Sequence, residues 1–247
     1  MRGTIGLMIW EGFGAGNAAL WLRDSPEFAS YLGNYHFNAV GNGKYDLISA
    51  EYYFEKELEL NPNSPSAWFQ LARISFVKGE RTEALERINF HIERFGDSSP
   101  PSYYVRGLIL GFSGRYAEAE ADFRKYLELN PQSPWGWNDL GWVMLMQKEY
   151  AEVSSELTLA MDNMPAADKN AWFWNTLGVA ELNLKHYENA ANAFRRAAFL
   201  AESLTPADWR RANPGNNPSL AEESLNKFRE VIRINLDRAD ALNRAES

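Results

Sequence analysis

Residues 134–165 read PWGWNDLGWVMLMQKEYAEVSSELTLAMDNMP. The pattern is that of two amphipathic helices joined by a short turn near residues 147–149, with large residues such as Trp137 and small ones such as Gly141 at helical spacing. The same order of large, small and aromatic residues recurs on both sides at intervals of 34 to 37 residues. A period of this length predicts a helical solenoid, in which each unit buries its apolar face against the next.

Five segments of the chain carry this pattern in register. Small residues such as Gly178 and Ala190 let neighbouring helices approach closely, and aromatic residues such as Phe123 and Phe194 fill the gaps beside them. Prolines that follow asparagine, as in Asn61-Pro62, stop one helix before the next begins. The five segments are residues 30–61, 65–96, 100–131, 134–165 and 171–202.

The succession resembles the tetratricopeptide repeat. That family has a large residue early in helix A, a small one four positions later, a Gly-x-Tyr turn, and small, aromatic and small residues along helix B before a proline. The first copy carries this pattern with two extra residues after the turn, at Gly43, Tyr45, Ala50, Phe54 and Pro62. The resemblance implies an all-α, right-handed solenoid of five to six helix-turn-helix repeats over residues 30–202, with a C-terminal capping helix.

Beyond the fifth copy the register fades. Thr205 and Pro206 predict the N-cap and first turn of a short helix, and residues 213–218 predict a loop. Residues 219–235 are amphipathic and predict a further helix. We therefore expect residues 203–247 to form a degenerate sixth repeat or capping helix, followed by a polar tail from Leu236.

An apolar, glycine-rich segment, residues 1–29, precedes the repeats. Residues 3–22 are about long enough to cross a hydrocarbon core of roughly 30 Å, but Glu11 and five glycines weigh against a spanning helix. The alternatives are burial in a partner or groove, membrane anchoring, and an uncleaved export signal or other remnant. Docking would use the large apolar residues Ile5, Leu7, Ile9, Trp10 and Phe13.

Composition narrows the classes of function. The formal net charge of −8 argues against nucleic acid, which needs a basic face. The chain has no cysteine and only three histidines, which lie far apart in sequence, and it has no metal-ligand or nucleotide-binding motif. We expect no enzymatic activity, no cofactor and no metal. The compartment is undetermined: a membrane-associated protein or a member of a complex is favoured over a soluble cytoplasmic or periplasmic one.

The resemblance also implies which helix A residues line a concave groove. Exposed aromatic clusters on such a surface mark binding sites, although the same rings could be half-buried against the next repeat. Asn138 and Asn175 could hold the backbone of an extended peptide, or be solvated. Arg73 is the only basic residue of the set, which argues against a clamp for a C-terminal carboxylate. The positions are Phe69, Arg73, Phe76, Tyr104, Leu108, Phe112, Trp135, Asn138, Trp142, Trp172 and Asn175.

These observations predict a non-catalytic scaffold that binds a peptide or apolar segment of a protein partner in an aromatic groove. The alternative is a structural subunit of a larger, perhaps membrane-bound assembly, docked through its N-terminal segment and touching lipid through residues 3–22. A third hypothesis places that apolar segment in the groove of its own or a neighbouring chain.

Overall fold

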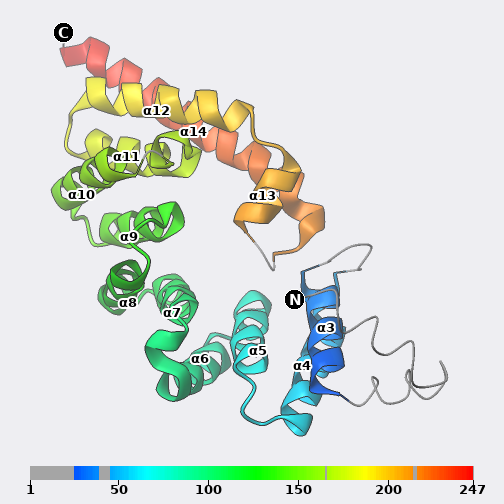
Figure 1. The fold of residues 1–247 in the computed structure, drawn as a ribbon. Coiled ribbons are helices and arrows are strands. Elements are labelled where there is room, and N and C mark those ends of the chain that lie inside the picture. Colours follow the sequence, from blue (N-terminus) through cyan, green and yellow to red (C-terminus); the bar gives the residue numbers. More distant parts are fainter. Residues whose placement is uncertain (1–24, 39–44, 165, 214–215, 247) are drawn as a thin grey trace. The chain divides into compact units, whose positions relative to one another are not determined.

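The structure, a computed structural model, describes residues 25–38, 45–164, 166–213 and 216–246. These residues form twelve α-helices and three short 3₁₀ helices, which confirms the all-α fold expected from the sequence (Figure 1). The chain divides into two compact units, Met1–His91 and Ile92–Ser247. The predicted N-terminal docking residues, from Ile5 to Phe13, lie outside the described residues.

The first unit contains the first three helices and most of the fourth. Its core consists of buried side chains from the first three helices: Phe37, Ala50, Phe54, Ala67, Leu71 and Ile74. The four helices are α3 (Pro26–Phe37), α4 (Leu47–Leu60), α5 (Pro65–Lys78) and α6 (Arg81–Phe95), the last of which extends past the boundary.

Helix α3 begins four residues earlier than the sequence pattern predicted. The Ser25 hydroxyl accepts a hydrogen bond from the Phe28 amide at 3.1 Å, and Pro26 occupies the first turn. A serine cap followed by proline is a strong helix start, because the hydroxyl satisfies an amide that has no partner within the helix. The predicted boundary at residue 30 therefore falls inside the first helix.

The second unit contains three complete helix pairs and a C-terminal extension. Each pair consists of two antiparallel helices joined by a short turn, as expected for the third to fifth copies (Figure 1). The pairs are α7 (Pro101–Phe112) with α8 (Tyr116–Leu129), α9 (Pro134–Met146) with α10 (Tyr150–Asn163), and α11 (Ala171–Asn183) with α12 (Tyr187–Glu202). The extension consists of α13 (Pro206–Ala212) and α14 (Ala221–Glu246), and the 3₁₀ helices η1 (Gly96–Ser98), η2 (Ala167–Lys169) and η3 (Pro218–Leu220) lie between longer elements.

Close approach within a pair depends on a glycine of the first helix facing an aromatic ring of the second. A Cβ atom placed on Gly178 would lie 2.7 Å from the ring of Phe194, and one on Gly107 would lie 2.9 Å from the ring of Phe123. Where the second copy has Ala72, the residue sixteen positions later is the smaller Ile88. The small residues and the rings therefore act as matched pairs, as the steric interpretation of the pattern predicted.

In three helix pairs, a tryptophan early in the first helix forms a hydrogen bond to the turn that precedes it. The indole N–H of Trp68 donates to the carbonyl oxygen of Pro62 at 3.0 Å. Trp137 does the same to Pro131 at 3.0 Å, and Trp174 to Asp168 at 2.9 Å. The donor and acceptor are six residues apart each time, so these tryptophans serve the repeat itself, as expected for packing positions.

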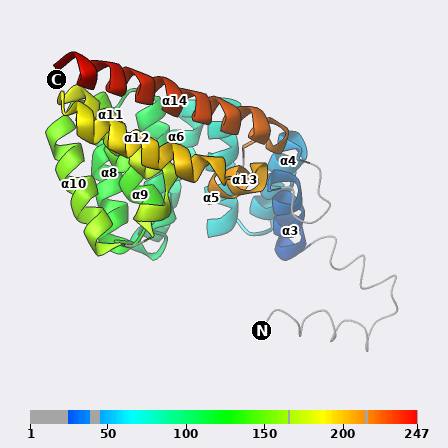
Figure 2. The ribbon, with the colours of Figure 1, turned by 90° about the horizontal axis from the view of Figure 1, so that it is seen from above.

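The prediction of a polar tail from Leu236 is wrong. Helix α14 continues to Glu246 and lies antiparallel along α12, as Figure 1 and Figure 2 show. Ala239 is fully buried against α12, and the Asp240 carboxylate pairs with Arg195 at 2.5 Å. The apolar contacts of α14 persist through its last turns, so the helix remains folded there.

Candidate functional site

The first helices of two pairs in the second unit present an apolar surface patch, which we call the α7–α9 patch: Phe112, Trp142 and Met146. The ring centroids of Phe112 and Trp142 are 4.9 Å apart. Phe112 is 54% exposed and Met146 is 45% exposed, which is high for side chains of this size. Met146 follows Trp142 by one helical turn and therefore shares its face of α9.

Gly111 allows the Trp142 ring to pack closely against α7. A Cβ atom at Gly111 would be 2.7 Å from Cζ3 of Trp142, closer than such contacts occur in proteins. The ring is half-buried by this contact. The orientation of Trp142 is thus fixed before any partner arrives, which lowers the entropy cost of binding.

A chain of hydrogen bonds connects the three first helices next to this patch. The Tyr104 hydroxyl donates to Oδ2 of Asp139 at 2.5 Å, and the Asn138 amide donates to Oδ1 of Asp139 at 3.0 Å. The Thr176 hydroxyl donates to the Asn138 amide oxygen at 2.9 Å. Burial raises the pKa of the Asp139 carboxyl from 3.8 to about 6, against the lowering effect of its two donors.

Asn138 is therefore a structural residue, contrary to the expectation that it would hold a peptide backbone. It is buried, and both ends of its amide are engaged within the molecule. Asn175 differs, because its amide oxygen has no hydrogen-bond partner among the described residues, although that oxygen is buried. Leu108 lies half-buried on α7. The sequence register missed Asp139, although it follows Trp135 by four residues and precedes Trp142 by three, which places it on their face.

Trp172 is covered by the C-terminal extension, which corrects the expectation that it faces a partner. Its ring stacks on Phe228 of α14 at 5.0 Å, with the planes 12° apart. Trp209 of α13 lies 5.6 Å from Trp172, and Trp135 lies 5.1 Å from it. The four rings form one cluster that docks the extension on the last repeat, so two of the three predicted groove tryptophans, Trp135 and Trp172, contribute to packing here.

The remaining predicted groove residues belong to the first unit. The guanidinium carbon of Arg73 lies 4.8 Å from the ring centre of Phe37 and 5.8 Å from that of Phe69. The Nη1 group of Arg73 donates to the side-chain oxygen of Gln70 at 2.7 Å, and burial lowers the pKa of Arg73 to about 10. Arg73 is thus held by cation–π contacts with Phe37 and Phe69. Phe76 is half-buried on the same helix.

Asp139 predicts a pH effect on stability that is specific to this site. Between about pH 4 and pH 6 the folded chain keeps the Asp139 proton while the unfolded chain releases it. The wild-type chain should therefore lose stability relative to Asp139→Asn as pH rises through this window, and the difference should be constant above about pH 7. Urea unfolding of both chains at pH 4.5 and pH 7 measures this difference in the free energy of unfolding. The same difference at both pH values would contradict the raised pKa of Asp139.

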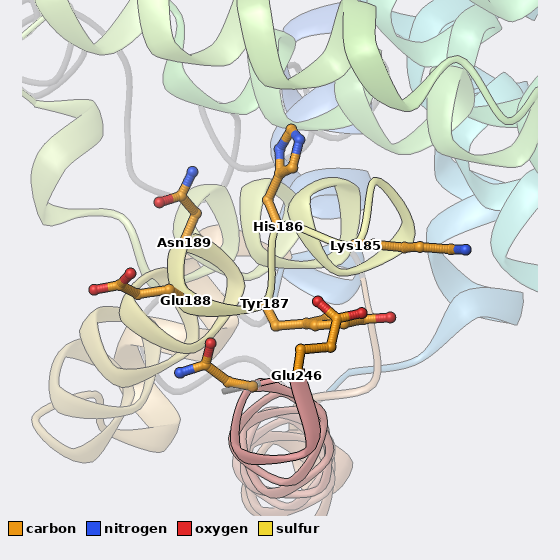
Figure 3. A pocket seen from close by; sticks show the side chains of 7 residues that line it. Lys185, His186, Tyr187, Glu188, Asn189 and Glu246 are labelled. Carbon is orange, nitrogen blue, oxygen red and sulfur yellow. The ribbon is translucent and has the colours of Figure 1, made fainter.

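Outside the α7–α9 patch, a shallow depression of about 360 Å³ lies between the start of α12 and the end of α14. Figure 3 shows the Tyr187 and Glu246 side chains between the two helices, whereas the His186 ring points away from Glu246. That ring pairs with Glu181 at 2.9 Å. The described residues contain no cluster of His, Asp and Glu able to hold a metal ion, and none of their helices is long and apolar enough to span a bilayer.

Comparison with known families supports the resemblance noted in the sequence. Residues 100–133 and 173–202 match one model of the tetratricopeptide repeat, and residues 123–153 match a second. A curated relative, anaphase-promoting complex subunit 3 of Schizosaccharomyces pombe, is 25% identical over 165 residues. That match covers 67% of this chain but 24% of the relative, so the chain spans about a quarter of its length.

Two solved structures show the same fold. A chain of the Cut9–Hcn1 hetero-tetramer of the anaphase-promoting complex superposes with a TM-score of 0.60 and 19% identity, covering 89% of this chain and 40% of that one. YrrB, described as a tetratricopeptide repeat protein with an unusual peptide-binding site, gives a TM-score of 0.57 and 17% identity, covering 77% of this chain and 94% of that one.

Proposed function

Because the chain is a tetratricopeptide repeat protein, and proteins of this family mediate protein–protein interactions, we propose that it is a non-catalytic scaffold that binds an apolar segment of a partner protein at the α7–α9 patch. The observation that carries the proposal is the exposure of Phe112 and Met146 beside a pre-oriented Trp142. Exposed aromatic and methionine side chains in contact with one another are typical of protein-binding surfaces. The peptide-binding site described for YrrB supports a peptide as the ligand class.

The neighbouring groups indicate the chemistry of the bound segment. Phe112, Trp142 and Met146 offer apolar area for one or two large side chains of the ligand. The bound segment should therefore present one or two large apolar side chains to the patch.

Selection of peptides from a phage-displayed random library against the full chain tests the proposal. Peptides selected on the wild-type chain should bind Phe112→Ser/Met146→Ser at least about tenfold more weakly, which corresponds to roughly 1.4 kcal/mol. Phe199→Ser is the matched control, since Phe199 is also exposed but lies on α12, a second helix of its pair. Equal affinities for the double variant and the wild-type chain would exclude the α7–α9 patch as the binding site of these peptides.

A second candidate function is that of a subunit in a larger assembly, which would dock through residues 3–22. The observation that favours it is that the curated relative is named as a subunit of the anaphase-promoting complex, and that Cut9 belongs to a hetero-tetramer. Size-exclusion chromatography of cell extracts would show such a subunit well above the mass of the free chain. Removal of residues 1–24 should shift it to the free position, and an unchanged elution would exclude this route.

A further inference from the structure

The first helix pair has an outer surface that no described residue covers, which we call the α3–α4 aromatic face: Tyr31, Ile48 and Tyr52. Tyr31 is 59% exposed on α3, and Ile48 and Tyr52 on α4 are 81% and 60% exposed. Ile48 and Tyr52 are one helical turn apart and so share a face of α4. The opposite face of α4, with Ala50 and Phe54, packs into the core of the first unit.

A continuous series of ring contacts joins the exposed residues of the two helices. On α3 the ring of Tyr31 lies 6.4 Å from Phe28 and 6.4 Å from Tyr35. Tyr35 contacts His36 at 5.2 Å, and His36 stacks on Tyr53 of α4 at 5.7 Å. Tyr53 then contacts Tyr52 at 5.2 Å. These ring contacts therefore connect Tyr31 of α3 with Tyr52 of α4, and Ile48 lies one turn before Tyr52.

We propose that residues 3–22 of the same chain cover the α3–α4 aromatic face and so cap the array. The segment is apolar, with Glu11 as its one charged residue, and only Arg23 and Asp24 separate it from Ser25, the N-cap of α3. Solenoids require a cap where the outermost repeat would otherwise expose the surface that packs on a neighbour. Burial of apolar surface on both sides drives the contact.

Because residues 3–22 are covalently connected to α3, their effective concentration at the α3–α4 aromatic face is high. A chain extends at most roughly 3.3–3.6 Å per residue, and the helices of the face are about 20 Å long. Residues 13–24 can therefore bring Phe13 to any point of α3 or α4. A second copy or a partner would have to compete with a segment that is already tethered beside its site. The inference does not depend on the α7–α9 patch.

The absence of cysteine from the chain permits a direct test by disulfide trapping in the full-length protein. One variant carries Phe13→Cys with Ile48→Cys, and its matched control carries Phe13→Cys with Asn63→Cys. Asn63 is exposed in the turn after α4, at the end of α4 where Glu57 bonds Ser30 near the start of α3, so an undocked tether would reach it at least as fast. Both variants are oxidised with glutathione disulfide at low micromolar protein, and their products are followed by non-reducing gels and mass spectrometry.

Docking predicts an intramolecular disulfide to residue 48 that forms at least about tenfold faster than the one to residue 63. Adding Tyr31→Ser to the first variant should reduce this rate advantage. A variant with Tyr52→Cys in place of Ile48→Cys should show the same rate advantage. Equal rates for the two pairs would overturn the proposal. A predominantly intermolecular disulfide would overturn it as well, because it would show that a second copy covers the face.

Discussion

Phe194→Ala is expected to lower the free energy of unfolding by about 3–5 kcal/mol. The Phe194 ring is fully buried and lies directly over Gly178, where an added Cβ would be 2.7 Å away. Its removal leaves a cavity between α11 and α12 that their backbones cannot close without losing other contacts. Urea unfolding followed by circular dichroism measures the loss.

The same contact predicts a coupling between two substitutions. Gly178→Ala should cost about 1–3 kcal/mol in the wild-type chain, because the new methyl group overlaps the Phe194 ring. In a Phe194→Ile background the cost should largely disappear, because the second repeat already combines Ala72 with Ile88 at this spacing. A double-mutant cycle measures the coupling, and equal costs in both backgrounds would show that the ring is not the obstacle.

Trp172→Ala should lower stability by about 3 kcal/mol and release the C-terminal extension first. Its ring contacts Trp135, Trp209 and Phe228, so the substitution removes the centre of the cluster that holds α13 and α14. In this variant the urea midpoint of unfolding should fall. Amide hydrogen exchange should accelerate more in α14 than in the other helices.

Phe199→Ala provides the control for this prediction, since the exposed Phe199 side chain should change stability by less than about 0.5 kcal/mol. Unchanged amide protection of α14 in Trp172→Ala would contradict the proposed role of the ring cluster. A defect in partner binding without any loss of stability would restore the original interpretation of Trp172 as a groove residue.

The helix pairs could be predicted from the sequence because the pattern that specifies them is local and repeated. Gly178 and Phe194 are sixteen residues apart, and Trp174 bonds to a carbonyl only six residues earlier. Such contacts depend on one repeat alone. They are therefore present in each copy that has the required residues, whatever lies beside it.

Trp172 shows why the candidate surface could not be predicted in the same way. The repeat register assigns it the same surroundings as Trp135, but Trp172 is in the last complete pair, where α13 and α14 replace a following repeat. Asn138 was misassigned for a related reason, since its partner Thr176 lies 38 residues away in the next pair. The environment of a groove position depends on its neighbours, which the register of one copy does not contain.

The full length of α14 was recoverable from the sequence. Leu236, Ala239 and Leu242 continue the three- and four-residue spacing of Leu225 and Ile232 and lie against α12, although charged residues dominate the composition around them. Mean polarity suggested a tail, whereas periodicity favoured a helix, and periodicity was the better guide.

The end of α12 constrains how this chain could have grown or could be lengthened. The Arg229 guanidinium donates to the carbonyl oxygens of Ala201 at 3.0 Å, Glu202 at 3.3 Å and Leu204 at 2.7 Å. A duplicated repeat inserted after α12 would separate these groups and leave charge and carbonyls without partners. A repeat inserted between α8 and α9 would keep them together, so gene duplication and protein engineering can both extend the array there without disturbing the Arg229 contacts.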